Sequence, residues 1–155
     1  MPNKTFLRDV IQSDLPFFYQ YQLEEEAIEM TSFPARDESA FYAHWSKIMA
    51  DSKILIKTIL FNEQVAGSVL SFEMEGEREV GYWLGKKFWG QGIASESLKQ
   101  FLGLETRRPL SAHIAKQNLA SKKVLEKCGF IVRGEYKWKP NPEAEEVDEF
   151  TLRLE

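Results

Sequence analysis

The chain contains short stretches in which apolar residues alternate with polar ones or run together, as they do in β-strands. These stretches predict four strands in the first half of the chain, at residues 5–9, 54–61, 65–74 and 80–84. Helical spacing predicts one helix from Leu15 to about Met30 and another from Ser39 to Ala50, separated by a break that contains Pro34. We therefore expect a strand, two helices and three antiparallel strands in sequence.

The second half of the chain changes to helical spacing directly after Gly92. The pattern predicts helices at 93–103 and 118–128 and strands at 110–114, 130–138 and 150–154. The later helix has a well-defined end, because Gly129 can adopt the left-handed conformation while Phe130 folds back onto Leu125. The full order is then β-αα-βββ-α-β-α-ββ.

This order predicts an α+β fold, a mixed α/β arrangement with helices on the faces of one sheet rather than a regularly alternating doubly wound fold. The 155 residues are 43% hydrophobic and 13% aromatic, which suits one core and excludes a disordered segment. Because no repeat or linker is visible, we expect residues 1–155 to form a single domain.

Few side chains are available for redox or metal chemistry. Cys128 is the only cysteine and there are two histidines, which excludes an internal disulfide and argues against a metal site. We assign no role to His44, His113 or Cys128. The first ten residues hold no long apolar run, so we expect neither a signal peptide nor a membrane span and interpret the protein as cytoplasmic.

Charge is divided unevenly along the chain. Residues 1–79 hold 7 basic and 14 acidic side chains, whereas residues 80–139 hold 12 basic and 4 acidic ones. The basic segment should attract a polyanionic ligand. Nucleic acid is one such ligand, but the overall net charge of -4 argues against it, and we expect no nucleic-acid partner.

The basic segment contains a glycine loop, Lys87-Phe88-Trp89-Gly90-Gln91-Gly92-Ile93-Ala94, between a predicted strand and a predicted helix. Such a loop presents unpaired backbone N–H groups at the positive end of a helix dipole and so binds phosphate. A dinucleotide fingerprint would need a third glycine and a later acid, and a Walker loop would need a Lys after its last glycine; both are absent. We expect a diphosphate on the N–H groups of about residues 89–94.

These residues resemble the acetyl-CoA loop of the GCN5-related N-acetyltransferase (GNAT) superfamily, (Q/R)-x-x-G-x-(G/A), with Lys87 in place of the usual Gln or Arg. A second segment, Asn118 to Phe130, resembles the family pattern N-x-x-(A/S)-x-x-x-x-x-K-x-G-F. The Trp89-Gly90 pair and the preceding Gly81-Tyr82-Trp83-Leu84 are similar to the ribosomal-protein N-acetyltransferase (RimJ/RimL-like) branch.

The resemblance implies a GNAT-like fold, in which a mixed, mostly antiparallel sheet splays apart to form a cofactor slot. Acetyl-CoA is the implied cosubstrate. The strand at 80–84 would bind its pantetheine arm, and backbone N–H groups near Trp83 or Leu84 would polarise the acetyl carbonyl. The implied cofactor-binding residues are Trp83, Leu84, Lys87, Trp89, Gly90, Gln91, Gly92, Ile93, Ala94, Asn118 and Ser121.

Catalysis needs a proton donor for the departing thiolate and a base for the amine. Many relatives carry a Tyr seven residues after the Asn, but Leu125 stands there, so the resemblance points to Ser121 as donor. The alternative is that Ser121 only bonds the backbone or the cofactor. Glu79 is the predicted base, unless it is an exposed strand-end carboxylate. The run Glu24-Glu25-Glu26 with Glu29 is the other candidate, although such runs usually form a solvated helix face.

The leading hypothesis is an enzyme that transfers acetyl from acetyl-CoA to a primary amine by direct attack in a ternary complex. The acidic first half suggests a cationic acceptor, such as a protein N-terminus, a polyamine or an aminoglycoside. A catalytically silent acyl-CoA-binding regulatory module is the alternative, which Leu125 in place of Tyr motivates. We expect no metal, no membrane partner, and a monomer or a homodimer.

Overall fold

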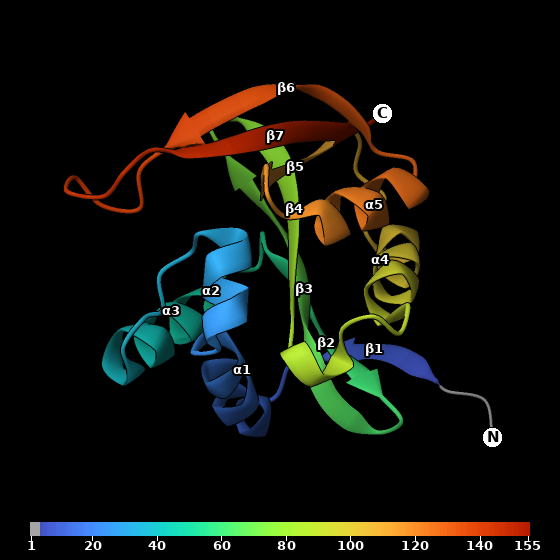
Figure 1. Ribbon diagram of the computed structural model, residues 1–155. Helices are drawn as coiled ribbons and strands as arrows, with labels where there is room; N and C mark the ends of the chain where they lie inside the picture. The colour runs from blue at the N-terminus through green and yellow to red at the C-terminus, as the bar shows by residue number, and fades with distance from the viewer. Residues whose placement is uncertain (1–3) are drawn as a thin grey trace.

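The computed structural model describes residues 4–155, which form a seven-stranded sheet with helices on both faces (Figure 1). The strands are β1 (Thr5–Asp9), β2 (Leu55–Phe61), β3 (Gln64–Met74), β4 (Glu77–Leu84), β5 (Leu110–Ala115), β6 (Ile131–Trp138) and β7 (Val147–Leu154). The helices are α1 (Leu15–Gln22), α2 (Glu25–Thr31), α3 (Glu38–Ala50), α4 (Ile93–Leu104) and α5 (Leu119–Lys127), with 3₁₀ turns η1 (Gln12–Asp14) and η2 (Lys86–Phe88). Helices α1 to α3 lie on one side of the sheet and α4 and α5 on the other.

Two apolar clusters hold these layers together. The larger lies between the sheet and helices α4 and α5, where Ile59, Val69, Phe101 and Leu152 are fully buried. The smaller joins α1 to α3 and includes Leu15, Phe18, Phe41 and Trp45. Because helices cover both faces, the central strand β3 is buried along most of its length rather than on alternate residues.

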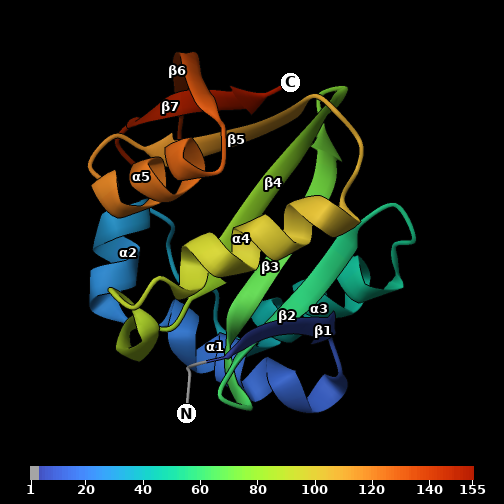
Figure 2. The same cartoon turned by 90° about the vertical axis from the view of Figure 1, so that its right-hand side faces the viewer.

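The sheet runs in the order β1-β2-β3-β4-β5-β7-β6, and β4 with β5 is its only parallel pair among the described residues. These two strands meet at a single register position, Glu79 opposite Ser111. Beyond it they diverge, while β5 stays paired along its whole length with β7 on its other edge (Figure 2). We call the unpaired stretch between residues 80–84 and 112–115 the sheet opening.

The predicted α+β fold is confirmed, and so is the predicted order in which the strands follow one another along the chain. The predicted single helix from Leu15 to Met30 is wrong, because α1 ends at Gln22 and α2 begins at Glu25. Between them Glu24 has an extended backbone, ψ 124°, and its carboxylate accepts the backbone N–H of Lys86 at 2.9 Å. A contact far away in the sequence therefore interrupts the helix.

The last strand is also longer than predicted, since β7 begins at Val147 rather than at Phe150. Asp148 and Glu149 have low strand propensity, which hid this part of the strand from a sequence-based prediction. Hydrogen-bonded pairing with β6 on one side and β5 on the other compensates for that low propensity.

Candidate functional site

The glycine loop has the geometry of an anion-binding helix start. Gly90 and Gly92 adopt left-handed conformations, with φ 73° and 77°, and Gly92 is the N-cap residue of α4. No atom lies within 4 Å of the position that a Cβ would occupy at either glycine. Glycine is therefore needed for the backbone conformation, and its missing side chain leaves the loop open to a ligand.

Free backbone donors follow the glycines. The first bond of α4 runs from the Glu96 N–H to the Gly92 carbonyl at 3.1 Å, and within residues 4–155 the N–H groups from Gly90 to Ser95 have no acceptor. These groups lie at the positive end of the α4 dipole. The Trp89 N–H, by contrast, donates to the Lys86 carbonyl at 3.0 Å, so the free donors begin one residue later than expected.

Side chains on both sides of the loop fix its position. The indole N–H of Trp89 donates to the Leu84 carbonyl at 2.9 Å, which ties the loop to the end of β4. The Lys86 ammonium lies 2.6 Å from the Glu26 carboxylate, next to the bond between the Lys86 N–H and Glu24. The acidic run proposed as an alternative base thus anchors the glycine loop to α2.

The remaining predicted loop residues contribute in different ways. The Lys87 ammonium lies 5.1 Å from the ring centre of Phe88, and the Lys87 carbonyl accepts the side-chain N–H of Gln91 at 3.2 Å. The side chain of Ile93 is buried in the larger core cluster, and Ala94 packs against that cluster. Ile93 and Ala94 can therefore offer a ligand only their backbone N–H groups.

Strand β4 directs alternate backbone groups into the sheet opening. The Gly85 N–H donates to the Ala66 carbonyl of β3 at 2.9 Å, and alternate residues of an antiparallel ladder face the same neighbour. Trp83 therefore turns its N–H toward β3, whereas Tyr82 and Leu84 turn theirs toward the opening. The backbone N–H groups of Trp83 and Leu84 were the two predicted donors to the acetyl carbonyl. Of these two, only the N–H of Leu84 faces the opening.

The start of α5 brings a hydroxyl pair to the same face of the sheet. The Asn118 side-chain oxygen accepts the Ser121 N–H at 3.2 Å and so caps the helix. The Ser121 Oγ lies 2.8 Å from the phenol oxygen of Tyr82, which connects α5 with β4. Burial raises the pKa of Tyr82 to about 12, so the phenol keeps its proton at neutral pH.

Glu79 lies at the point where β4 and β5 meet, and its side chain faces α1 and α2. It is only 2% exposed, so the exposed strand-end interpretation is wrong. Its Oε1 lies 3.2 Å from His113 Nε2, and His113 Nδ1 lies 3.0 Å from the Thr151 hydroxyl. Burial, followed by the charges of Glu77 and Glu149, raises the pKa of Glu79 to about 7.

Three residues of this region were not predicted. Tyr82 could have been found, because it lies in the strand at 80–84 that the resemblance assigns to the pantetheine arm. His113 and Glu149 carried no such signal, since their importance comes from the order of β4, β5 and β7 in the sheet. Burial lowers the pKa of His113, which leaves its ring neutral beside Glu79 at neutral pH.

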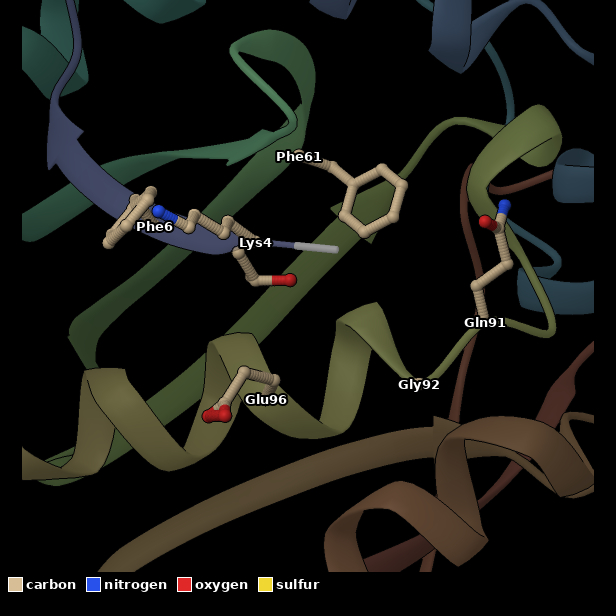
Figure 3. Close-up of a pocket in the computed structure, with 7 residues that line it drawn as sticks. Lys4, Phe6, Phe61, Gln91, Gly92 and Glu96 are labelled. Carbon is tan, nitrogen blue, oxygen red and sulfur yellow. The ribbon is translucent and has the colours of Figure 1, made fainter. Parts of the chain in front are cut away.

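A groove lies beside the glycine loop, lined by Lys4, Thr5, Phe6, Phe61, Gln91, Gly92 and Glu96 (Figure 3). The Glu96 carboxylate would repel a phosphate on this side. The opposite side of the loop faces α5, which carries Lys122 and Lys123 and no acid in its first turn. An anionic ligand is therefore expected between the loop and α5.

No group of three or more His, Cys, Asp or Glu side chains in residues 4–155 is placed to hold a metal ion. None of the helices in this part of the chain is long and apolar enough to cross a membrane.

Comparison with known proteins relates the chain to one enzyme family. A family model described as acetyltransferase (GNAT) domain matches residues 4–131. The structure is similar to spermidine N-acetyltransferase from Vibrio cholerae in complex with CoA and spermine, with TM-score 0.80 and 16% identity over 97% of this chain and 94% of that one. A search of curated sequences gave no significant match.

Two further structures share the fold. Phosphinothricin acetyltransferase from Sinorhizobium meliloti in complex with acetyl-CoA has TM-score 0.79 and 18% identity, over 97% of this chain and 87% of that one. The ribosomal L7/L12 alpha-N-protein acetyltransferase RimL in complex with CoA has TM-score 0.77 and 22% identity, over 95% and 92%.

The raised pKa of Glu79 predicts a pH-dependent free energy of unfolding. A buried carboxyl with a folded-state pKa of about 7 and an unfolded value near 4.5 stabilises the fold below pH 4.5, and this contribution is lost as pH rises to 7. Wild type should lose this contribution between pH 5 and pH 8, whereas Glu79→Gln has no such carboxyl. The free energy of unfolding of Glu79→Gln should therefore rise by about 2 kcal/mol relative to that of wild type between these two pH values. Urea denaturation at both pH values measures the change.

Glu143→Gln serves as the control, because Glu143 is exposed. Its free energy of unfolding should differ from that of wild type by the same amount at pH 5 and at pH 8. Glu105 does not interfere, because Arg107 and Ser71 lower its pKa to about 2 against the effect of burial, and its contribution is lost only below pH 4.5. A Glu79→Gln difference that stays constant from pH 5 to pH 8 would contradict the assignment.

Proposed function

Since the chain belongs to the GNAT acetyltransferase family and is an acetyl-CoA-dependent N-acetyltransferase, we propose that it acetylates a cationic primary amine by direct attack in a ternary complex. The observation that carries this proposal is the sheet opening, with a buried carboxylate at its closed end and free N–H donors at the glycine loop. One face of the opening would admit acetyl-CoA and the other the amine.

The donor side consists of the glycine loop, β4 and α5. The N–H groups of Gly90 to Ser95 would bind the diphosphate, and those of Tyr82 and Leu84 would pair with the pantetheine arm and the thioester. Asn118 keeps its role as the cap of α5 and leaves its side-chain N–H₂ group to hold pantetheine. The oxyanion that forms on the acetyl carbonyl would be stabilised by the Leu84 N–H.

Glu79 is proposed as the general base. The acceptor ammonium loses a proton to the Glu79 carboxylate, directly or through water, and its nitrogen then attacks the acetyl carbon. A pKa of about 7 makes the carboxylate a better base than an ordinary glutamate while leaving much of it ionised at neutral pH. His113 and Thr151 fix the orientation of the carboxylate.

Ser121 is proposed as the general acid. As the C–S bond breaks, the CoA thiolate takes the Ser121 proton, and the neutral Tyr82 phenol replaces it through their 2.8 Å contact. Water then takes the second proton of the attacking nitrogen and returns a proton to Tyr82. Leu125 occupies the usual place of the catalytic Tyr and is buried in the core, so it cannot contribute a proton. In the relatives that carry the catalytic Tyr, the proton donor comes from α5 alone. In this chain we propose that Tyr82 of β4 and Ser121 of α5 supply the proton together.

Several observations support the proposed acceptor, the proposed branch of the family and the proposed location of the protein. The acceptors named for the similar structures, spermidine and a ribosomal protein, are amines, and the acidic first half of the chain favours a cation. The Trp89-Gly90 loop and Ser121 support the RimJ/RimL-like branch. We further propose that residues 1–155 act as a single cytoplasmic domain, which the continuous sheet and the lone cysteine support.

The acid assignment is tested with acetyl-CoA and a panel of amines, by following thiol release and the acetylated product by mass spectrometry. Ser121→Ala should lower kcat about 100-fold with unchanged acetyl-CoA affinity, and Tyr82→Phe about tenfold. The double variant should be no slower than Ser121→Ala, because the hydroxyls act in series. Normal turnover of Ser121→Ala would refute its role, and wild-type CoA binding without transfer to any amine would favour the silent module.

The base assignment is tested by the pH dependence of kcat/KM. Wild-type kcat/KM should rise through a pKa of about 7, since Glu79 must lose its proton before it can accept one. Glu79→Gln should lower kcat/KM about 100-fold and remove this step, leaving only the titration of the amine itself. If kcat/KM of Glu79→Gln still rises through a pKa of about 7, the titrating group is not Glu79.

A further inference from the structure

We propose that Glu149 binds a second ammonium group of the acceptor, so that the enzyme selects diamines and polyamines over monoamines. This inference rests on the proposed function and names its substrate class. The reacting amine would meet Glu79 at the closed end of the sheet opening, while the second ammonium lies against β7.

Glu149 shares a sheet face with the proposed base. Along β7, Thr151 is two residues from Glu149 and contacts His113, which in turn contacts Glu79, so all four side chains face the same side. Phe150, between them in sequence, faces α5 instead, where the Lys122 ammonium lies 5.9 Å from its ring centre. The two acids therefore belong to one acceptor-side surface.

Glu149 differs from the other buried acids in having no basic partner. It is 6% exposed, yet among residues 4–155 no Lys, Arg or His forms an ion pair with it. Two of the other three buried carboxylates have such a partner, Asp14 with Arg8 at 2.7 Å and Glu105 with Arg107 at 2.9 Å, whereas Glu79 contacts the neutral His113 ring at 3.2 Å. Burial of a carboxylate without a counter-charge is costly even where the Trp138 indole donates a hydrogen bond to it, and a ligand cation would compensate that cost.

Two aromatic residues of β6 lie beside Glu149, and the indole of one of them, Trp138, donates a hydrogen bond to its carboxylate. Tyr136 lies opposite Glu149 in the strand register, and its ring centre is 4.5 Å from that of His113. Trp138, next on the same face of β6, contacts Phe33 at 5.2 Å between ring centres. Because Phe33 comes from the loop after α2, the rings form a wall built from two parts of the chain. A carboxylate beside aromatic faces suits an alkylammonium group.

An acid-rich groove lies beside the start of β7. Its lining includes Ser32, Gln117, Glu145, Glu146 and Asp148, together with Lys116; the Lys116 ammonium is paired with Glu135, and Asp148 lies 3.6 Å from the Lys137 ammonium. Gln117 donates to the Ser32 hydroxyl at 2.8 Å and so joins the start of α5 to the loop after α2. Carboxylates accept hydrogen bonds and do not donate them, which favours a ligand with ammonium donors over a peptide with carbonyl groups.

The experiment compares kcat/KM for 1,5-diaminopentane, 5-amino-1-pentanol and pentylamine, which share chain length and a reacting primary amine. Wild type should prefer the diamine at least about tenfold over either monoamine, the size expected for one charged hydrogen bond. Glu149→Gln should reduce this ratio to near 1. Glu143→Gln, an exposed acid on the same connection, should leave the ratio as in wild type.

The outcomes separate this inference from the proposed function. Equal rates for all three amines in wild type, or an unchanged ratio in Glu149→Gln, would overturn the role of Glu149 while leaving N-acetylation intact. Preference for a peptide N-terminus over the diamine would also overturn it. Absence of transfer to every amine would refute the proposed function itself. The wild-type comparison needs no variant, so it holds even if Glu149→Gln folds poorly.

Discussion

The single register contact between Glu79 of β4 and Ser111 of β5 is the constraint on which the rest of the site depends. Beyond this contact β5 stays paired with β7 on its other edge but diverges from β4, so the edge of β4 that faces β5 is left unpaired from residue 80 onward. An unpaired strand inside a covered sheet is unfavourable unless another group supplies the hydrogen bonds. We propose that this group is the extended arm of acetyl-CoA.

Strand alternation then separates the two halves of the reaction. Tyr82 and Leu84 turn their side chains toward α4 and α5, where Tyr82 meets Ser121. Glu79 and Trp83 turn theirs toward α1 and α2, where the Trp83 indole donates to the Tyr21 carbonyl at 3.3 Å. In the proposed mechanism, one strand therefore carries the proton donor on one face and the proton acceptor on the other, and the reacting carbonyl would lie between them.

The sequence predicted those parts of the fold and site that depend on local patterns. Alternation and helical spacing located the strands and helices, and Gly129 marked the end of α5, where the Phe130 N–H bonds the Leu125 carbonyl at 3.0 Å. The glycine loop was visible because two positive-φ residues precede a helix. Glu79 and Ser121 were proposed from the family resemblance, and their catalytic roles stay predictions.

The parts that escaped prediction depend on contacts between distant segments. The break between α1 and α2 follows from the bond between Glu24 and Lys86, which no helical pattern contains. His113 was left without a role because nothing local indicates that β5 lies beside β4 at Glu79. Glu149 was part of a segment too acidic to be recognised as a strand, and only the pairing of β7 with both β5 and β6 shows where its side chain lies.

The most direct test of this account is residue-resolved amide hydrogen exchange by NMR, with and without acetyl-CoA. Binding in the sheet opening predicts slower exchange at Tyr82, Leu84 and the free N–H groups of Gly90 to Ser95, while Trp83 and Trp89, already bonded within the protein, change little. Protection confined to the groove between β1 and α4, or unchanged exchange at Tyr82 and Leu84 with saturating acetyl-CoA, would contradict it.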